Sequence, residues 1–478
     1  MRLIILIILL CCNILLEATA QNAAIDRLFA SKNLSAASYS IYAIDANTGV
    51  TICETSQKSL STASVMKLMT TAVALELLGP DYTFSTSLYY SGVIDPQTGI
   101  LNGNLVLKGG GDPAFFSSFF KEHYSSCFAN WVSQLKKWGI KRVKGNLILD
   151  LSSLENATIP GGWCWDDIGN YYGAGVSSLT FSDNLYDIHF SSPESVSKKT
   201  TIKNIYPEIP ELKIDNKVLS SARTGDHTIV FGAPGSTSQV IEGTIPTNQS
   251  DFVVKAATPD PPLLAGRTFL RELRAEGIGI SGVITKTSSE VAGSKALIGN
   301  QLSPPLKDLI VPLNKESLNL FAEHLLLEIG RRSTGEPFVS KGIEAYHLFC
   351  KNKGIDTVGF FPADGSGLTR SNALTARTLV ETMKYMYDGK NGVYFFDALP
   401  IAGVDGTLRN SFKGTPLEKN MKAKTGSMAR VRSIAGLMKT KSKKNLLFAI
   451  LINNFDLTSS ETTKLLESIL MSFYNDQL

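Results

Sequence analysis

Residues 38–51 alternate between polar and apolar side chains on either side of a turn-forming sequence at 45–49. Alternation around such a turn is typical of a β-hairpin. From Ser64 the pattern changes, and apolar side chains recur every three or four positions until the Gly-Pro pair at 79–80. This spacing predicts a buried helix that begins at Ser64.

The C-terminal part of the chain carries a related pattern. Apolar segments at 434–438 and 446–452 flank a turn-like stretch at 439–445, and a helically periodic segment follows at 459–473. These segments predict two strands and a terminal helix. We expect strands from both ends of the chain to share one antiparallel sheet.

The middle of the chain, residues 85–290, has a different pattern. Short alternating segments, for example at 101–108, 143–151 and 227–231, are separated by Gly, Pro, Asn and Asp. Such punctuation is typical of strands joined by turns. We interpret 85–290 as a β-rich region inserted into an α+β unit that the two ends of the chain form.

The first twenty residues have the pattern of a secretory signal peptide. Arg2 precedes an apolar run at 3–16, and Ala18 and Ala20 have the spacing of a cleavage site. The run is too short to favour a membrane span, and no later stretch approaches the roughly 20 apolar residues that a bilayer requires. We therefore expect export to the periplasm or cell-wall exterior, removal of residues 1–20, and no transmembrane anchor afterwards.

Composition excludes some classes of function. A formal charge of +4 over 478 residues argues against a nucleic-acid partner. After signal removal Cys53, Cys127, Cys164 and Cys350 remain, and these permit up to two disulfides or none. The five histidines have no metal-ligand spacing and no C-x-x-C pair occurs, so we expect no metal site.

Ser64 and Lys67 are three residues apart, so on a helix both side chains project from the same face. A lysine whose pKa is lowered by burial or by neighbouring positive charge can take the proton of a serine hydroxyl. The Ser-x-x-Lys pattern is weak alone, because it also occurs at Ser118, Ser133 and Ser195. Ser64 differs from these three because it begins a long apolar helix.

Two further motifs fit this chemistry. Lys424-Thr425-Gly426-Ser427 precedes the C-terminal strands, where a lysine charge, a threonine hydroxyl and the space left by glycine suit a carboxylate. A Ser-x-Asn motif occurs at Ser182 and again at Ser317. We favour Ser317 with Asn319, because a helical segment follows it, whereas a strand-like segment follows Ser182.

In this order, Ser-x-x-Lys, Ser-x-Asn and Lys-Thr-Gly resemble the signature of the penicillin-binding protein and serine β-lactamase superfamily. The chain is more closely similar to one branch, the class C low-molecular-mass penicillin-binding proteins, which are D-alanyl-D-alanine carboxypeptidases and endopeptidases. Four stretches carry this resemblance: 109–113 (GGGDP), 314–327 (NKESLNLFAEHLLL), 364–372 (DGSGLTRSN) and 403–410 (GVDGTLRN).

The resemblance implies a β-lactamase/transpeptidase-like domain at 21–84 and 291–478, with an antiparallel sheet flanked by helices. It implies two small β-rich domains in the insertion at 85–290. The implied activity is that of a serine-type D-Ala-D-Ala carboxypeptidase that acts on peptidoglycan stem peptides, binds β-lactams and needs no cofactor. A DD-endopeptidase would use the same acyl-enzyme, and the sequence leaves that balance and the oligomeric state open.

The resemblance also implies roles at matching positions. Ser64 would be the nucleophile, Lys67 its base, Ser317 a proton relay, and Asn319 a contact to the substrate peptide. The N–H groups of Ser64 and Ser427 would form the oxyanion hole. The implied carboxylate site comprises Lys424 and Thr425, with Gly426 between Thr425 and Ser427.

The stretch at 161–175 (GGWCWDDIGNYYGAG) resembles a family segment that reaches over the active site. By this resemblance Asp167 and Tyr172, with Arg370, would contact a peptide side chain that bears an amine and a carboxylate. Opposed charges suit such a zwitterion. The same stretch also fits a hydrogen-bonded turn whose aromatic side chains pack in a core.

Other interpretations stay open at this point. A serine β-lactamase shares the motifs, but rapid deacylation needs a further water-activating group, and no motif supplies one. The large insertion also suits a noncatalytic peptidoglycan-binding protein, although the catalytic set is intact. A Ser-His-Asp hydrolase is disfavoured, because no Gly-x-Ser-x-Gly sequence is present.

Overall fold

The computed structural model describes residue 25 and residues 29–154, 159–293 and 295–476. The predicted signal peptide, residues 1–20, lies outside the described residues. Within the described part of the chain, none of the helices is both long and apolar enough to span a bilayer.

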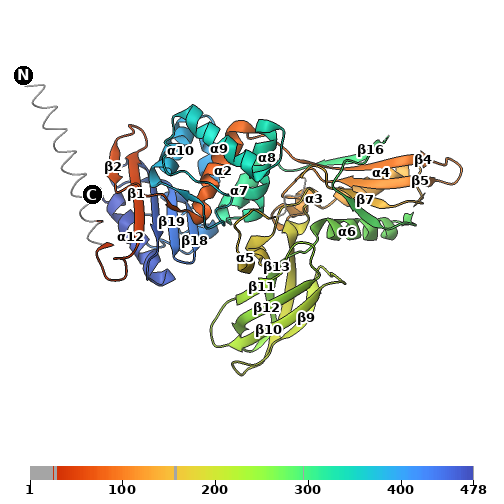
Figure 1. Cartoon of the computed structure of the whole chain (residues 1–478), viewed down its shortest axis with the longest axis horizontal. Helices are drawn as coiled ribbons and strands as arrows, with labels where there is room; N and C mark the ends of the chain where they lie inside the picture. Colours follow the sequence, from red (N-terminus) through yellow and green to blue (C-terminus); the bar gives the residue numbers. More distant parts are fainter. Residues whose placement is uncertain (1–24, 26–28, 155–158, 294, 477–478) are drawn as a thin grey trace, which may run out of the picture.

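A five-stranded antiparallel sheet built from both ends of the chain forms the centre of the first unit (Figure 1). Its strand order is β18 (Met421–Met428), β19 (Val431–Lys439), β20 (Asn445–Asn453), β1 (Ser38–Asp45) and β2 (Thr51–Glu54). The middle strand β20 is buried along almost its whole length, which explains its uninterrupted apolar sequence. The predicted N-terminal hairpin and its sharing of one sheet with the C-terminal strands are confirmed.

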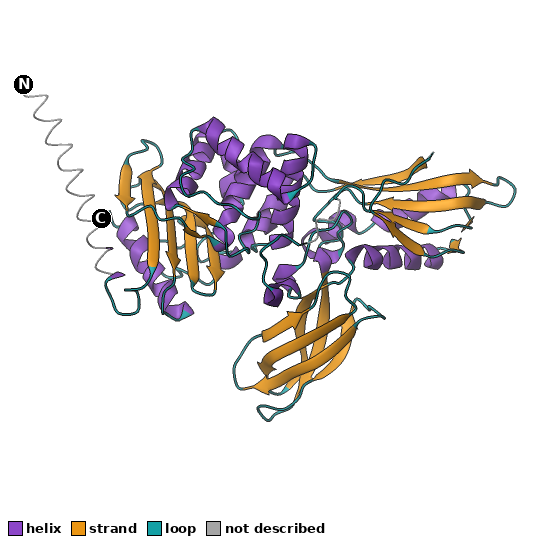
Figure 2. Cartoon of the chain, viewed as in Figure 1, coloured by secondary structure: helices purple, strands orange, loops and turns teal. Residues whose placement is uncertain are grey.

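Helices cover both faces of this sheet (Figure 2). One face packs against α12 (Ser459–Tyr474), and the other packs against α10 (Ala376–Asp388). The helices α2 (Met66–Leu77) and α8 (Asn319–Thr334) belong to the same core as α10 and pack against each other. A short 3₁₀ turn, η1 (Ala63–Val65), leads directly into α2, so the helix predicted from Ser64 is confirmed. The remaining elements are α7 (Leu306–Lys315), α9 (Val339–Lys353), α11 (Gly392–Asp397), β3 (Leu60–Ser61), β17 (Ala373–Leu374) and η5 (Gly406–Leu408).

The first inserted unit is a seven-stranded sheet backed by helices (Figure 1). The aromatic rings of Phe128 and Trp131 on α4 pack against Phe269 on α6, so the two helices share one core. The strands are β14 (Gly279–Ile280), β6 (Arg142–Val143), β5 (Ile100–Lys108), β4 (Ser85–Ile94), β16 (Lys295–Leu302), β7 (Leu147–Asp150) and β15 (Ile284–Thr287). The helical elements are η2 (Ser118–Phe120), α3 (Lys121–Tyr124), α4 (Cys127–Lys137) and α6 (Pro261–Ala275).

The second inserted unit consists of two three-stranded sheets. One contains β13 (Gln249–Ala257), β8 (Leu185–Ser192) and β9 (Thr201–Tyr206), and the other β10 (Lys213–Ser221), β12 (Ser238–Pro246) and β11 (His227–Phe231). Side chains of β8 alternate strictly between buried and half-buried, as expected for a strand with one face in a core. This unit has its own small core, to which Tyr186, Ile188, Phe190, Val230, Ile241 and Val254 contribute.

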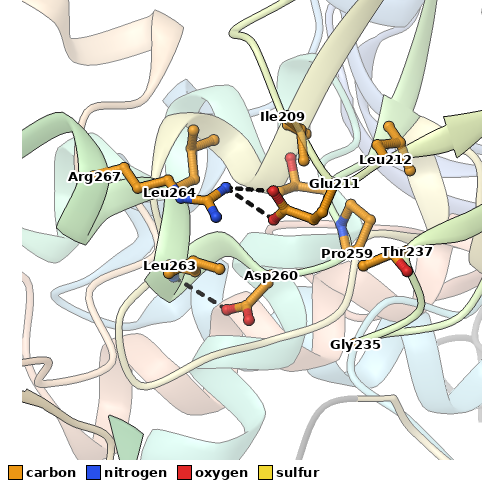
Figure 3. Close-up of a pocket in the computed structure, with 11 residues that line it drawn as sticks. Ile209, Glu211, Leu212, Gly235, Thr237, Pro259, Asp260, Leu263, Leu264 and Arg267 are labelled. Atoms are coloured by element: carbon orange, nitrogen blue, oxygen red, sulfur yellow. Dashed lines mark hydrogen bonds and ion pairs between the residues drawn. The ribbon is translucent and has the colours of Figure 1, made fainter. Parts of the chain in front are cut away.

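An ion pair joins the two inserted units. The Arg267 guanidinium on α6 donates to both carboxylate oxygens of Glu211, at 2.8 and 2.7 Å (Figure 3). Beside this pair lies a cavity of about 220 Å³, lined on the α6 side by Leu263 and Leu264. None of the predicted site residues lines this cavity, so it belongs to the junction of the inserted units.

Strand pairing carries the inserted sheet beyond the predicted limit at residue 290. β16 pairs with β4, with Leu302 opposite Ser85, so residues 295–302 belong to the inserted sheet and not to the five-stranded one. The two partner strands lie roughly 200 residues apart in the sequence, a distance over which local periodicity gives no information. The helices α4 and α6 accompany the seven strands of the first inserted unit.

Disulfides do not link the four cysteines of the described chain. Cys127 and Cys350 are buried free thiols, and Cys164 is a half-buried free thiol. Because these three are free, none of the pairings that the sequence permits with Cys53 or among themselves is formed.

Candidate active site

Ser64 lies in η1, two residues before α2 begins at Met66, and Lys67 lies in the first turn of that helix. The preceding residue Ala63 has a left-handed φ of 46°, which turns the chain sharply at the serine. Lys67 Nζ is 3.0 Å from Ser64 Oγ. The structure therefore brings the predicted hydroxyl and amine into direct contact.

Lys67 is fully buried, at 0% exposure. Its Nζ also donates to Asn319 Oδ1 at 2.6 Å and to the Ser366 carbonyl at 2.7 Å. Burial lowers the pKa of Lys67 to about 7, against the opposing pull of the Asp364 and Glu323 carboxylates. An amine with such a pKa is deprotonated in a large fraction of molecules at neutral pH.

Ser317 and Asn319 lie at the junction of α7 and α8. Ser317 has a left-handed φ of 62°, and Asn319 is the first residue of α8. The other candidate, Ser182, begins the short turn η4 (Ser182–Asn184) ahead of β8, and Asp183 in that turn accepts hydrogen bonds from Ser118. The structure thus brings Ser317, and not Ser182, to the serine–lysine pair.

The edge strand β18 lies on the other side of the serine. Lys424 is fully buried, and its Nζ donates to Ser317 Oγ at 2.9 Å. Burial lowers the pKa of Lys424 well below its usual range, and the neighbouring Lys67 lowers it further. At Gly426 an added Cβ would lie 2.9 Å from Ser64 N and 2.7 Å from the Thr62 carbonyl, so glycine permits the strand to approach the nucleophile.

These groups meet in a cleft of about 560 Å³. Lys67, Lys424 and Gly426 lie behind its wall, where they contact the lining residues. The predicted residues that line the cleft are Ser64, Ser317, Asn319, Thr425, Ser427, Asp167, Tyr172 and Arg370.

The inserted segment at 161–175 forms the outer wall of the cleft through α5 (Trp165–Ile168) and η3 (Tyr171–Gly173). The Tyr172 hydroxyl lies beside the Asp167 carboxylate, and burial raises the pKa of both groups. The Tyr172 carbonyl accepts a hydrogen bond from Asn319 Nδ2 at 2.8 Å. The insertion therefore contacts the Ser-x-Asn motif directly.

Cys164, Asp166 and Asp167 each bring one donor atom to within 4.8 Å of the others, a possible set of metal ligands among the described residues. Arg370 Nε lies 3.2 Å from Cys164 Sγ, as its hydrogen-bond donor. The guanidinium places a positive charge beside the donor atoms, which disfavours a cation there. We therefore assign the cluster to the outer wall of the cleft.

Sequence reasoning missed three residues that the structure brings to the site. Thr407 lines the cleft, and its hydroxyl is 2.7 Å from that of Thr425. Glu323 and Asp364 are buried beside Lys67. All three lie in stretches that carry the family resemblance, but an acid or a threonine inside such a stretch gives no indication of what it faces.

Comparisons with known proteins agree with this geometry. The chain matches the D-Ala-D-Ala carboxypeptidase 3 (S13) family over residues 21–472. D-alanyl-D-alanine carboxypeptidase DacB of Haemophilus influenzae is 26% identical over 421 residues, which are 87% of this chain and 85% of that protein. The D-alanyl-D-alanine carboxypeptidase of Actinomadura sp. strain R39 is 26% identical over 427 residues, 86% of this chain and 77% of that protein.

Among solved structures, the crystal structure of penicillin binding protein 4 from Haemophilus influenzae matches with a TM-score of 0.80 at 24% identity. The match covers 92% of this chain and 97% of that one, so the likeness includes the inserted units. The fold and the cleft define a peptidase of the penicillin-binding type. More specifically, the chain belongs to the D-Ala-D-Ala carboxypeptidase 3 (S13) family, and it is a hydrolase of the peptidase class. The predictions of family, α+β fold class and enzyme class are confirmed.

Proposed function

We propose that this D-Ala-D-Ala carboxypeptidase works through an acyl-enzyme on Ser64, with Lys67 as the base. The arrangement around Lys67 Nζ carries the proposal. Two of its three neighbours, Asn319 Oδ1 and the Ser366 carbonyl, can only accept hydrogen bonds. A neutral amine gives one hydrogen to each of them, which leaves its lone pair for the Ser64 hydroxyl, 3.0 Å away.

In the first step Ser64 Oγ attacks the carbonyl carbon of the D-Ala-D-Ala peptide bond, and its proton passes to Lys67. The backbone N–H groups of Ser64 and Ser427 stabilise the developing oxyanion. The C–N bond then breaks, and Ser317 relays a proton to the departing D-alanine amine. Water hydrolyses the ester on Ser64 in the second step and restores the free hydroxyl.

The terminal carboxylate of the substrate binds at β18. Lys424 supplies N–H donors and Thr425 a hydroxyl, as their positions beside Ser317 and in the cleft wall suggest. Thr407 adds a second hydroxyl, since it is hydrogen-bonded to Thr425. Asn319 keeps one Nδ2 hydrogen for a carbonyl of the substrate peptide, because its other contacts use Oδ1 and the second Nδ2 hydrogen.

The outer wall selects the third residue of the stem peptide. Asp167 and Arg370 present opposite charges to the cleft, with Tyr172 beside them. A side chain that ends in both an amine and a carboxylate matches this pair. If the leaving D-alanine belongs to a cross-linked peptide, the same reaction makes the protein a DD-endopeptidase as well. β-Lactams would acylate Ser64 as substrate analogues.

We assign residues 21–84 and 303–478 to the catalytic domain and 85–302 to the two inserted units, on the basis of strand pairing.

The leader-like sequence at 1–20 supports export, and peptidoglycan as the substrate requires it. The periplasm or the cell-wall exterior is therefore the proposed location.

Purified mature protein tests the assignment. It should release D-alanine from a pentapeptide and become labelled by fluorescent penicillin, and Ser64→Ala should lose both activities. Ser195→Ala is the matched control, because Ser195 heads another Ser-x-x-Lys sequence but is exposed in the inserted region. Retention of both activities by Ser64→Ala would exclude the proposed nucleophile.

The fate of the penicillin adduct separates the nearest alternative. A long-lived adduct is expected for a peptidase, whereas rapid repeated turnover of penicillin would indicate a β-lactamase. Binding of peptidoglycan fragments without cleavage would instead indicate a noncatalytic role. Analysis of products from whole sacculi then distinguishes D-alanine release from cleavage of cross-links.

A further inference from the structure

Behind the cleft wall, four ionisable side chains are almost completely removed from solvent. Lys67, Lys424 and Asp364 are 0% exposed and Glu323 is 1% exposed. The two carboxylates act electrostatically on Lys67, and neither is part of the serine, lysine, Ser-x-Asn or Lys-Thr-Gly motifs. Buried carboxylates are costly unless they are paired and hydrogen-bonded, so their presence calls for a role.

The Glu323 carboxylate holds the backbone turn that contacts Lys67. Its two oxygens accept hydrogen bonds from the N–H groups of Gly365, at 3.1 Å, and Ser366, at 2.8 Å. The carbonyl of the same Ser366 accepts from Lys67 Nζ at 2.7 Å. A path of hydrogen bonds therefore runs from Glu323 through the backbone of one residue, Ser366, to the amine.

Other contacts fix the same turn without replacing Glu323. Thr70 Oγ1 donates to the Gly365 carbonyl, and the Tyr346 hydroxyl donates to Thr70. Asp364 accepts from the N–H groups of Gly367 and Thr369. Glu323 accepts the N–H of Ser366, whose carbonyl accepts a hydrogen bond from Lys67.

We propose that Glu323 is a positioning residue for acyl transfer: it holds the 364–367 turn against Lys67 and places a buried carboxylate beside the amine. This inference rests on the proposed role of Lys67 as the base. Glu323 does not touch the substrate or Ser64. It acts on the reaction only through the orientation and the charge of Lys67.

The effect on pH dependence follows from the groups that face Lys67. These are Glu323 on α8, Asp364 in the turn, Lys424 on β18 and, through Thr70, the Tyr346 hydroxyl on α9. Both oxygens of Glu323 accept backbone N–H groups, which favours the ionised form, and this carboxylate raises the pKa of Lys67. Burial and the neighbouring Asp364 act the other way and raise the pKa of Glu323. Lys67 must lose its proton to act as a base, so removing this carboxylate should move the acid limb of the activity profile to lower pH.

The mature full-length Glu323→Gln variant tests this. Penicillin acylation rates and D-alanine release would be measured over about pH 5–9. We expect the acid limb of the rate profile to move down by roughly one pH unit, since one opposite charge near an ionisable group has an effect of that order. We also expect the maximal rate to fall roughly 10–100-fold, because the amide cannot accept both N–H bonds and the turn is displaced.

Glu328→Gln is the matched control. Glu328 is a buried glutamate on the same helix, but its carboxylate pairs with Arg331 and Tyr82. The control should leave the acid limb in place even if it lowers thermal stability. A Glu323→Gln profile with an unmoved acid limb would overturn the proposal, even if the variant were less stable or slower.

Glu323→Asp serves if the glutamine variant does not fold. It keeps the charge but is one methylene shorter, so we expect a slower reaction with the acid limb within about 0.3 pH unit of the wild type. A limb displaced to lower pH by Glu323→Asp would overturn the proposal. Labelling of wild-type Ser64 by penicillin is a separate readout, so failure of the proposed function is distinguishable from failure of this inference.

Discussion

The inner and outer sides of the cleft are built differently. On the inner side Lys67, Lys424 and Asp364 are fully buried, and each makes two or more hydrogen bonds to fixed partners. On the outer side Arg370 is exposed and Asp167 is half-buried. The groups that we propose for the reaction are thus held by several fixed contacts, whereas those that we propose to meet the variable part of a substrate are more exposed. Substitutions should therefore cost most on the inner side and least on the outer side.

Gly367→Ala should have the largest effect. Gly367 has a left-handed φ of 86°, and an added Cβ would lie 1.9 Å from the carbonyl of Ala63, the residue before the nucleophile. The turn or the serine must then move. We expect the free energy of unfolding to fall by about 2–4 kcal/mol and penicillin acylation to fall by about 100-fold or more. Denaturant unfolding and acylation kinetics measure the two effects.

Gly354→Ala separates strain from position. Gly354 also has a left-handed φ, of 67°, but nothing lies within 4 Å of the position that its Cβ would take. Conformational strain alone should cost about 1 kcal/mol of stability, with no change in acylation rate. If Gly367→Ala behaved like Gly354→Ala, the inner side would not be as rigid as its contacts indicate.

The sequence was sufficient to predict much of the inner side. The helix at Ser64 and the strands after Lys424 follow from local periodicity, and the choice of Ser317 over Ser182 needed only the helix that follows it. In these cases a motif and its element lie within a few residues of each other. The family resemblance then placed the outer residues Asp167 and Arg370 on one cleft, where the structure also has them.

Contacts between distant segments could not be predicted. Glu323 reaches the turn at 364–367 across about 40 residues, and β16 pairs with a strand about 200 residues earlier. Periodicity shows that a residue is buried, but it does not show what the residue faces. The contact between Asp364 and Trp163 could not be predicted either, because the two residues lie about 200 positions apart and in different units of the chain.

Trp163→Phe should have an intermediate effect, because it breaks a contact between the two sides. Trp163 Nε1 donates to Asp364 Oδ2 at 3.0 Å, and phenylalanine keeps one aromatic ring but loses the N–H donor. We expect a loss of about 1.5–3 kcal/mol in stability, since the bond is to a charged group. We expect up to about 1.4 kcal/mol of this lost stabilisation to raise the free energy of the transition state for acylation. The acylation rate would then fall by up to about tenfold.

Trp138→Phe is the control for this substitution. Trp138 is half-exposed in the inserted region, where it packs edge-to-face against Tyr90. It should change neither the acylation rate nor, beyond about 0.5 kcal/mol, the free energy of unfolding. Equal acylation rates for wild type and Trp163→Phe would show that the insertion does not help to hold the catalytic turn.

Arg370→Ala should have the smallest effect and the most selective one. Arg370 is exposed, and an exposed charge pair contributes about 1 kcal/mol, so cleavage of a peptide with a zwitterionic third residue should slow roughly fivefold. Penicillin lacks that residue, so its acylation rate should stay within about twofold. Arg332→Ala, an exposed arginine on α8, should alter neither rate. If the variant slowed penicillin acylation and peptide cleavage equally, Arg370 would support the reaction itself. The outer side of the cleft would then not be limited to substrate selection.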